Sequence, residues 1–432
     1  MLFAGKNSKR FVLGYDLGDE VSQISFLASD SDMPETLSIL AGAELYNIPT
    51  VLCKRHDVNQ WFYGKEAVKH ISEDDGVEVT NLVTLAREGQ MVDVDGMEYD
   101  PIALLTLFVK RTLSLLSMEM SINLVDAIMV TTKNLDNRMV KVLNLVMNGL
   151  DLKDVKVYYQ SHEESFYYYM MYQPEELMIR DVIACDYGYG DMTVYKLSLN
   201  HNTRPIVITI NSKQYDEMSL PDKAVPVDSS RSRVLEELDE NFYKIMQENC
   251  ENCIVTSIFL LGDGFKDAWM KKSLEYMCRT RRVFQGNNLF SKGASIAARE
   301  RINPSQIDSK YVFLGEDKLK ANLGLMLKKQ GTEVYHALLD AGVNWYEASC
   351  QLETILESGN MIDIQMTPVT GGELSTVSIV LDGLEKRPPR TTRLRITVDM
   401  TAVNRVRIHI EDLGFGEIFK APDKSWTQEF NI

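Results

Sequence analysis

Three stretches of the sequence share one design: Val12-Leu13-Gly14-Tyr15-Asp16-Leu17-Gly18, Val182-Ile183-Ala184-Cys185-Asp186-Tyr187-Gly188-Tyr189-Gly190 and Ile258-Phe259-Leu260-Leu261-Gly262-Asp263-Gly264. In each, an apolar run suited to a buried strand stops at glycines and an acid, which is typical of a strand leading into a phosphate-binding turn. Glycine lets backbone N–H groups approach phosphate oxygens, and an aspartate at a strand end can hold a hydrated magnesium ion. One such turn is a weak signal, but three in order predict two related half-domains that close on one nucleotide.

These stretches resemble the loops of the actin-like ATPase superfamily, and the whole chain resembles the DnaK-type heat-shock chaperones. Residues 14–18 are similar to that family's first phosphate loop, 186–191 to its second and 261–266 to its adenosine loop. Residues 290–298 resemble the Gly-Ala helix that closes the ATPase domain, and residues 381–412 resemble the β-sandwich that grips peptides. The resemblance implies a divergent bacterial branch of that family.

The resemblance also implies the fold class and the domains. We expect an α/β chain in which residues 1–300 form an actin-like, two-lobed ATPase domain with a duplicated ribonuclease-H-like fold. The insertion in the second lobe is short compared with the family, which weakens the expected clamp on adenine. Short alternating runs after residue 310 predict an antiparallel β-sandwich over residues 310–422, without a helical lid. Residues 312–314 lie where the family has its interdomain connector.

Composition limits the classes of partner. The chain has 432 residues, of which 45% are hydrophobic and 25% charged, as expected of a globular protein with two or three domains. A net charge of −16 argues against nucleic acid as a partner. We expect no membrane span, because no stretch of the sequence approaches the roughly 18 apolar residues that a span needs. Residues 1–10 lack the apolar core of a signal peptide, so we expect a cytoplasmic protein.

Cysteine spacing gives one further motif. The six cysteines are scattered, which does not predict a disulfide scaffold. Cys250 and Cys253 form a C-x-x-C pattern, which is typical of half a zinc site or of a redox pair. A tetrahedral zinc site needs two further ligands at comparable spacing, and none follows, so the sequence favours reduced thiols in a loop before a strand.

Five residues are candidates for metal binding and catalysis. Asp16 and Asp186 end two strands and are expected to orient magnesium, and by resemblance Asp186 also positions the attacking water. Glu163 aligns best with the family's glutamate near the metal, with Glu164 as the alternative. Arg87 falls where the family has a catalytic lysine. Arginine keeps the charge but is not a compact ammonium, and a surface ion pair is an equal alternative.

The expected nucleotide-binding residues are those of the three loops: Gly18, Asp19, Glu20, Gly188, Tyr189, Gly190, Gly262, Asp263, Gly264 and Lys266. Several depart from the family pattern. Asp19 and Glu20 replace hydroxyl residues, Asp191 replaces a threonine, and Tyr189 and Asp263 replace glycines. Two like unit charges about 4 Å apart repel by roughly 4 kcal/mol at an effective dielectric of 20, so carboxylates facing phosphate weaken binding unless a metal compensates.

The resemblance implies two possible functions. In the first, ATP or ADP with magnesium binds between the lobes, and this is coupled to an unfolded or extended peptide, or a specific protein partner, on the β-sandwich. The substituted loops then predict weak ATPase activity at most. In the second, the chain is a degenerate actin-like binding or scaffold protein without ATP turnover.

Overall fold

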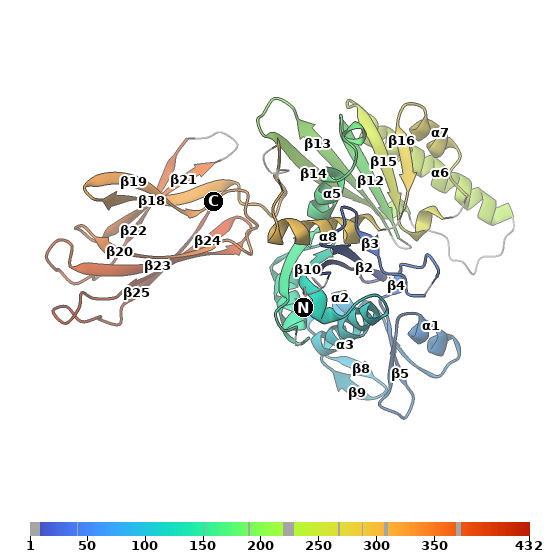
Figure 1. The fold of residues 1–432 in the computed structure, drawn as a ribbon, viewed down its shortest axis with the longest axis horizontal. Helices are drawn as coiled ribbons and strands as arrows, with labels where there is room; N and C mark the ends of the chain where they lie inside the picture. The colour runs from blue at the N-terminus through green and yellow to red at the C-terminus, as the bar shows by residue number, and fades with distance from the viewer. Residues whose placement is uncertain are drawn as a thin grey trace, which may run out of the picture. The chain divides into compact units, whose positions relative to one another are not determined.

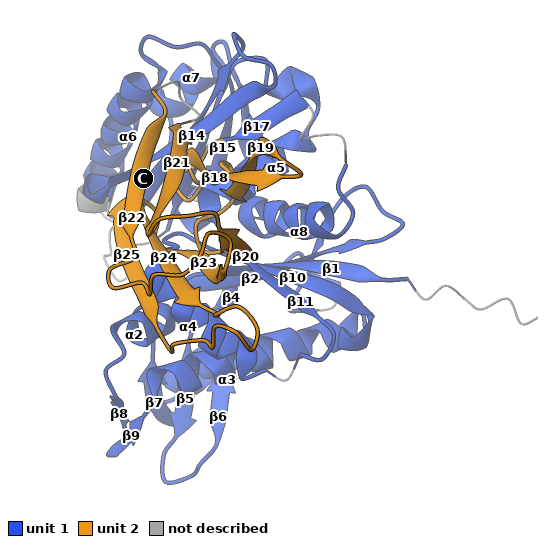
Figure 2. Ribbon diagram, turned by 90° about the vertical axis from the view of Figure 1, so that its left-hand side faces the viewer, with its two compact units in different colours: residues 1–313 blue, residues 314–432 orange. Residues whose placement is uncertain are grey.

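The computed structural model describes residues 9–432 except 41, 151, 189–190, 219–228, 267, 287, 306–309 and 369–372. The chain divides into two compact units, Met1–Phe313 and Leu314–Ile432, which we call unit 1 and unit 2 (Figure 2). Unit 1 contains two large mixed β-sheets with α-helices packed on them, and unit 2 is entirely antiparallel β-structure (Figure 1). The predicted α/β lobes followed by an antiparallel β region are therefore confirmed at this level.

The first sheet of unit 1 has the order β11-β10-β1-β2-β3, with β4 pairing beside β2. The central strand β1 runs antiparallel to β2 and parallel to β10, which in turn runs parallel to β11. The strands are β1 (Phe11–Leu17), β2 (Val21–Ala28), β3 (Glu35–Thr36), β4 (Ile48–Pro49), β10 (Val125–Thr132) and β11 (Lys156–Ser161).

The second sheet repeats this arrangement in the order β16-β15-β12-β13-β14-β17. Its central strand β12 runs antiparallel to β13 and parallel to β15, which runs parallel to β16. The strands are β12 (Asp181–Tyr187), β13 (Met192–Asn200), β14 (Ile206–Tyr215), β15 (Val255–Leu261), β16 (Arg282–Gln285) and β17 (Tyr311–Phe313). Because β17 pairs with β14, residues 311–313, most of the expected connector, belong to this sheet.

Two helices each follow one large sheet in the chain but pack on the other. Helix α5 (His162–Met171) follows β11 of the first sheet, but its side chains Phe166 and Met170 pack in the core of the second. Helix α8 (Leu289–Ile302) follows the second sheet and packs on the first, where Ala294 and Ala297 contact its core. The helices cross closely at Gly293, where a Cβ atom would lie only 1.9 Å from the Ser165 carbonyl oxygen.

Among the other helices of unit 1, α3 and α4 begin at side-chain caps of their own. Asp100 accepts a hydrogen bond from Ile102 N at the start of α3, and Asp136 accepts one from Met139 N at the start of α4. Pro101 occupies the first turn of α3, where its missing N–H costs nothing. The other helices are α1 (Gly64–Ser72), α2 (Leu82–Glu88), α3 (Pro101–Ser114), α4 (Asn137–Asn148), α6 (Ser229–Cys250) and α7 (Lys272–Cys278).

Short elements complete unit 1. A three-stranded sheet has the order β6-β5-β7, and β8 and β9 form a hairpin. The strands are β5 (Leu52–Arg55), β6 (Trp61–Tyr63), β7 (Gly76–Val79), β8 (Val92–Val94) and β9 (Met97–Tyr99). The 3₁₀ turns are η1 (Leu115–Met118), η2 (Ile122–Leu124), η3 (Glu175–Leu177), η4 (Asp216–Met218) and η5 (Asp263–Phe265).

One helical stretch, Pro101–Met118, is 18 residues long and apolar enough in composition to cross a membrane. The expectation that no stretch of the chain reaches this length is therefore wrong. The side chains of Leu104, Leu105 and Phe108 are buried within unit 1. A core helix that packs an apolar stripe against its own fold meets the same criteria of length and composition.

Unit 2 consists of two four-stranded sheets, with the orders β19-β18-β21-β22 and β20-β23-β24-β25. Burial alternates along β23, where Leu394, Ile396 and Val398 are inaccessible, as expected of strands with one face on a core. Arg387 and Asp412 form a buried ion pair with 2.9 Å between Nη2 and Oδ2. The strands are β18 (Ala321–Lys329), β19 (Thr332–Leu339), β20 (Ser349–Leu356), β21 (Met361–Pro368), β22 (Ser375–Val380), β23 (Thr392–Ala402), β24 (Arg405–Asp412) and β25 (Ser425–Asn431).

Candidate functional site

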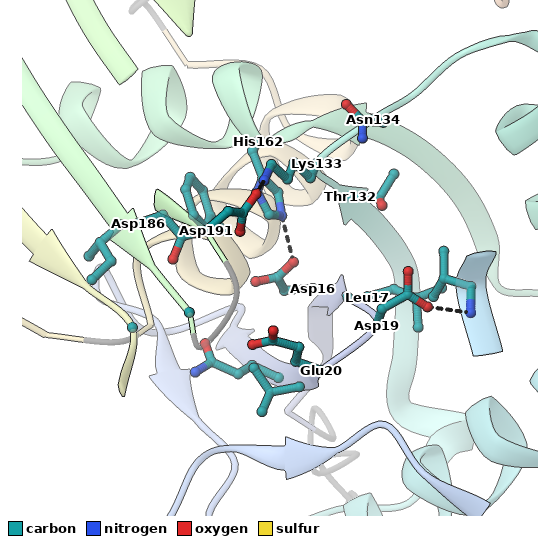
Figure 3. Close-up of a pocket in the computed structure, with 18 of the residues that line it drawn as sticks. Asp16, Leu17, Asp19, Glu20, Thr132, Lys133, Asn134, His162, Asp186 and Asp191 are labelled. Atoms are coloured by element: carbon teal, nitrogen blue, oxygen red, sulfur yellow. Dashed lines mark hydrogen bonds and ion pairs between the residues drawn. The ribbon is translucent and has the colours of Figure 1, made fainter. Parts of the chain in front are cut away.

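A cavity of about 430 Å³ in unit 1 is lined by residues from both of its sheets (Figure 3). We call it the cleft cavity. The first sheet contributes the ends of β1 and β10, and the second contributes the ends of β12 and β15. Its volume falls in the range of about 300–1,000 Å³ that is typical of small-molecule sites. Six carboxylates line it: Asp16, Asp19, Glu20, Asp186, Asp191 and Asp263.

Asp16 and Asp186 occupy equivalent places in the two sheets. Each is the penultimate residue of its central strand, β1 or β12, and both line the cleft cavity. Burial, with smaller contributions from the negative charges of Asp16 and Asp191, raises the pKa of Asp186 to about 6, although His162 and Lys133 oppose the shift. The two predicted metal-binding carboxylates therefore lie in one site, and one of them is poorly solvated.

His162 is the main residue of the site that sequence reasoning missed. Its Nε2 lies 2.8 Å from Asp16 Oδ1, and its ring stacks on Phe290 with centroids 3.9 Å apart. The Tyr195 hydroxyl lies 3.4 Å from Nδ1. Burial lowers the pKa of His162, but the negative charges of Asp16, Asp186 and Glu163 outweigh burial and raise it. His162 is thus a buried partner that fixes the Asp16 carboxylate.

Glu163 lies outside the cleft cavity lining, although it was the preferred candidate beside the metal. Its Oε1 accepts a hydrogen bond of 2.8 Å from the Ser212 hydroxyl on β14. The alternative, Glu164, is buried and is also absent from the cavity lining. The reason is helical phase: α5 begins at His162, and each following residue is rotated by about 100°, so His162 faces the cavity and its successors turn away.

Arg87 lines the cavity but already has a carboxylate partner. Its guanidinium forms an ion pair with Asp136, the N-cap residue of α4. Burial alone would raise the pKa of Asp136, but the Met139 N–H and Arg87 outweigh burial and lower it. Arg87 is therefore a cavity-lining residue and at the same time a member of a partly exposed ion pair.

Asp19 acts as the cap of a helix that lies far away in the sequence. Its Oδ1 accepts hydrogen bonds from Val83 N (2.9 Å) and Thr84 N (3.0 Å), and its Oδ2 accepts one from the Thr84 hydroxyl (2.7 Å). Asn81, at the N-cap position of α2, makes no side-chain cap of its own. The carboxylate expected to face phosphate is therefore engaged with the first turn of α2, although Asp19 still lines the cavity.

Glu20 lies against Gly188, which directly follows β12. A Cβ atom added to Gly188 would lie 2.7 Å from Glu20 Oε2, so a larger residue there would displace this flexible carboxylate. Gly18, Gly188 and Gly262 line the cavity, whereas Gly264 is buried and packs against the Tyr187 ring. The predicted site residues Tyr189 and Gly190 lie outside the described residues.

Gly262 is needed for its backbone conformation. Its φ of +90° lies in the region that favours glycine, and a Cβ atom would lie 2.3 Å from the Tyr187 carbonyl oxygen. The following residue, Asp263, accepts a hydrogen bond of 2.9 Å from Asn47 Nδ2 and pairs with Lys266 at 2.7 Å. Lys266 itself is absent from the cavity lining.

Lys133 is a second residue that sequence reasoning missed. It follows β10 and forms a 2.7 Å ion pair with Asp191, which directly precedes β13. This contact and the Asn47–Asp263 hydrogen bond each join residues near the first sheet to residues near the second. Both contacts lie at the cavity, so they hold its two sides together.

The charge of the cavity favours a cation. Among the lining residues that the structure describes, six are carboxylates and only Arg87 and Lys133 are permanently cationic side chains. No group of three or more metal-binding side chains occurs among the described residues. Magnesium is commonly held by one or two carboxylates together with water and phosphate oxygens, so Asp16 and Asp186 fit a magnesium ion carried by a phosphate ligand.

The fold and site define a two-lobed α/β protein with an acidic cavity between its sheets, followed by an all-antiparallel β unit. Residues 33–316 match the model described as family of unknown function DUF5716, C-terminal, and the chain belongs to that family. Residues 318–432 match a second model, domain of unknown function DUF8552. The two matches meet close to the boundary between units 1 and 2. No match was found among curated proteins.

Proposed function

We propose that unit 1 binds a nucleotide with magnesium in the cleft cavity, as a divergent relative of the actin-like ATPases and of DnaK-type chaperones. The observation that carries the proposal is the paired placement of Asp16 and Asp186 at equivalent ends of two similar sheets, facing one cavity. These carboxylates would hold magnesium, and backbone N–H groups at Gly18, Gly188 and Gly262 would donate hydrogen bonds to phosphate oxygens. Magnesium would neutralise the phosphate charge among the surrounding acids.

The arrangement of the sheets supports this relationship. Each sheet combines an antiparallel hairpin on one side of its central strand with parallel strands on the other. Helices α5 and α8 each follow one sheet and pack on the other. Such a repeat, with exchanged helices at the cleft, agrees with the duplicated ribonuclease-H-like fold implied by the sequence resemblance.

Hydrolysis is proposed to be slow. Glu163 bonds to Ser212 outside the cavity lining, and Arg87 and Lys133 are each paired with a carboxylate. A nucleotide must compete with Asp136 and Asp191 for these two cations. Exchanging existing ion pairs yields less net binding energy than engaging free charges, because the original partners lose their counter-ions.

Unit 2 is proposed to hold an extended peptide or a segment of a specific protein partner. Both of its sheets have edge strands, and Val334 on β19, Ile355 on β20 and Val380 on β22 are exposed apolar residues on such strands. An edge strand presents unpaired backbone groups to which an extended chain can add as a further strand. Nucleotide-dependent binding of peptide would distinguish a chaperone-like activity from simple partner docking.

Thermal unfolding with Mg-ADP, Mg-ATP and ATP plus chelator tests the nucleotide proposal. A ligand at 100 times its Kd stabilises the folded state by about 2.7 kcal/mol, which raises Tm by several degrees. Asp186→Asn removes one proposed magnesium ligand and should abolish the rise, whereas Asp30→Asn, an exposed acid paired with Lys9, should retain it. Absence of any shift with the wild-type protein at millimolar Mg-nucleotide would refute the proposal.

A scaffold protein without a nucleotide is the second candidate. It is favoured by the Lys133–Asp191 and Asn47–Asp263 contacts, which already join the two sides of the cavity. In this case Mg-nucleotide leaves Tm unchanged, while Lys133→Met alone lowers it because Asp191 loses its counter-ion. Under the first proposal the wild-type protein responds to Mg-nucleotide, so one melting series separates the two.

A further inference from the structure

Two cysteines and a lysine form a cluster away from the cleft cavity lining. Cys250 is the last residue of α6 and is buried, while Cys253 lies three residues later and is partly exposed. Asn252, between them, has a φ of +61° and turns the chain out of the helix. Both sulfurs pack against the same apolar core beside β12 and β15.

Lys196 on β13 reaches the more exposed thiol. Its Nζ lies 3.1 Å from Cys253 Sγ, and Cys253 Sγ lies 3.4 Å from the Asn249 carbonyl oxygen. An ammonium group at this distance stabilises the negative charge of a thiolate, which is the reactive form of cysteine. Burial raises the pKa of Cys250, and the smaller opposing effects of Arg281 and Lys196 do not cancel it. The two thiols are therefore in different environments, one near a cation and one buried.

We propose that Cys250 and Cys253 are a redox-active dithiol, in which Cys253 is the attacking thiol, Lys196 promotes its reactivity and Cys250 resolves the oxidised sulfur into a disulfide. A disulfide requires Cβ atoms roughly 3.5–4.5 Å apart. Cys253 lies beyond the turn at Asn252 and contributes to the raised pKa of Cys250, so the two side chains are neighbours in the structure.

The oxidant class is a peroxide, and the step balances. The Cys253 thiolate attacks one oxygen of hydrogen peroxide, the O–O bond breaks, and a sulfenic acid and hydroxide form; the hydroxide takes a proton to give water. The sulfur of Cys250 then attacks the Cys253 sulfur, the S–O bond breaks, and a second water leaves with the Cys250 proton. Two thiols lose two electrons in total, and one peroxide becomes two waters.

The test is peroxide oxidation of the full chain in a Cys278→Ser background, because Cys278 is exposed and reacts independently. Intact mass should fall by about 2 Da, and peptide mapping should join Cys250 to Cys253. Cys250→Ser should instead leave a sulfenic acid on Cys253 that dimedone traps, and Cys253→Ser should give neither product. Reaction of both thiols with iodoacetamide after peroxide, at the rate of the untreated protein, would overturn the proposal.

The role of Lys196 has its own matched control. Lys196→Met should slow disulfide formation by about threefold to tenfold, because the attacking sulfur loses the ammonium group 3.1 Å away that stabilises its negative charge. Lys213→Met removes a similar charge from the neighbouring strand β14, where Lys213 pairs with Glu248 of α6, and should leave the rate unchanged. Equal rates in the two variants, with circular dichroism confirming that both are folded, would show that Lys196 does not act on Cys253.

Discussion

At the scale of single residues, the cleft cavity is organised by side chains that hold one another in place. His162 fixes Asp16, Lys133 pairs with Asp191, and Asp19 caps α2. The Glu20 carboxylate lies against Gly188, one of the places where the proposed phosphate would bind. Its negative charge would then repel the ligand directly.

Replacing Glu20 by glutamine is expected to tighten Mg-nucleotide binding. Glu20 is exposed within the cavity, so solvent screening reduces the repulsion, and we expect Kd to fall about threefold to tenfold, or about 0.7–1.4 kcal/mol. Isothermal titration calorimetry with Mg-ADP measures the change. Glu35→Gln, an exposed acid on β3 outside the cavity lining, is the control and should bind as the wild type. Weaker binding by Glu20→Gln would instead mean that Glu20 contributes to holding magnesium.

At the scale of elements, helices of unit 1 are joined by capping bonds between distant segments. Asp239 on α6 caps α7: its carboxylate accepts from Lys272 N at 2.8 Å and from Lys271 N and Ser273 N at 3.1 Å. Burial alone would raise the pKa of Asp239, but the bonds from Ser273, Lys272 and Lys271 outweigh burial and lower it. This cap therefore links the stability of unit 1 to pH.

Asp239→Asn is expected to destabilise unit 1 by about 1–2 kcal/mol near neutral pH, because it removes a charge-assisted cap. Since the folded pKa is lowered, the stabilisation is present above the unfolded value of about 3.9 and is lost as pH falls through the folded pKa. The difference in Tm between wild type and variant should therefore stay constant above about pH 5 and shrink below about pH 4.

Glu240→Gln is the matched control for that experiment. Glu240 is the next residue on α6 and forms an exposed ion pair of 2.6 Å with Lys272 Nζ. Surface pairs of this kind contribute about 0–1 kcal/mol, so the control should melt close to the wild type. A Tm difference for Asp239→Asn that persists unchanged to pH 3 would contradict the assignment of this pH dependence to the carboxylate.

The way in which helices and strands position their residues explains which features of the site could be predicted from the sequence. Asp16 and Asp186 were predictable because an apolar strand, a glycine and an acid are neighbours in the chain. Glu163 was placed near the metal by its alignment with the family's glutamate, but such an alignment does not fix helical phase, and a shift of one residue rotates a helical side chain by about 100°. The capping role of Asp19 joins residues 64 positions apart, and local patterns carry no signal for such a contact.

Lys133 and His162 illustrate a signal that was present but unused. Each directly follows a strand of the first sheet that runs parallel to β1, namely β10 or β11. The carboxyl ends of parallel strands meet at one edge of a sheet, so the rule that selected Asp16 also selects these two residues. Sequence reasoning applied the rule only where glycine was nearby.

At the scale of the whole molecule, the chain consists of two units with separate cores. Unit 1 ends with β17, which completes the second sheet, and unit 2 contains both partners of every pair in its two antiparallel sheets. Units with their own cores commonly fold on their own and unfold in separate transitions. We therefore expect that the chain can be divided after Phe313 into two fragments that each fold.

The fragments 1–313 and 314–432 are expected to fold when produced separately, and the full chain should show two calorimetric transitions that match those of the fragments. Because the cleft cavity lies wholly within unit 1, Mg-ADP should raise the transition temperature of fragment 1–313 only.

Fragment 1–310 is the sharper comparison, since it lacks β17 and exposes the edge of β14. It should melt several degrees below fragment 1–313. A single cooperative transition in the full chain, together with an unfolded 314–432 fragment, would mean that the two units depend on each other for stability. In that case nucleotide binding in unit 1 would also stabilise unit 2, and the calorimeter would record the ligand's effect on the whole chain.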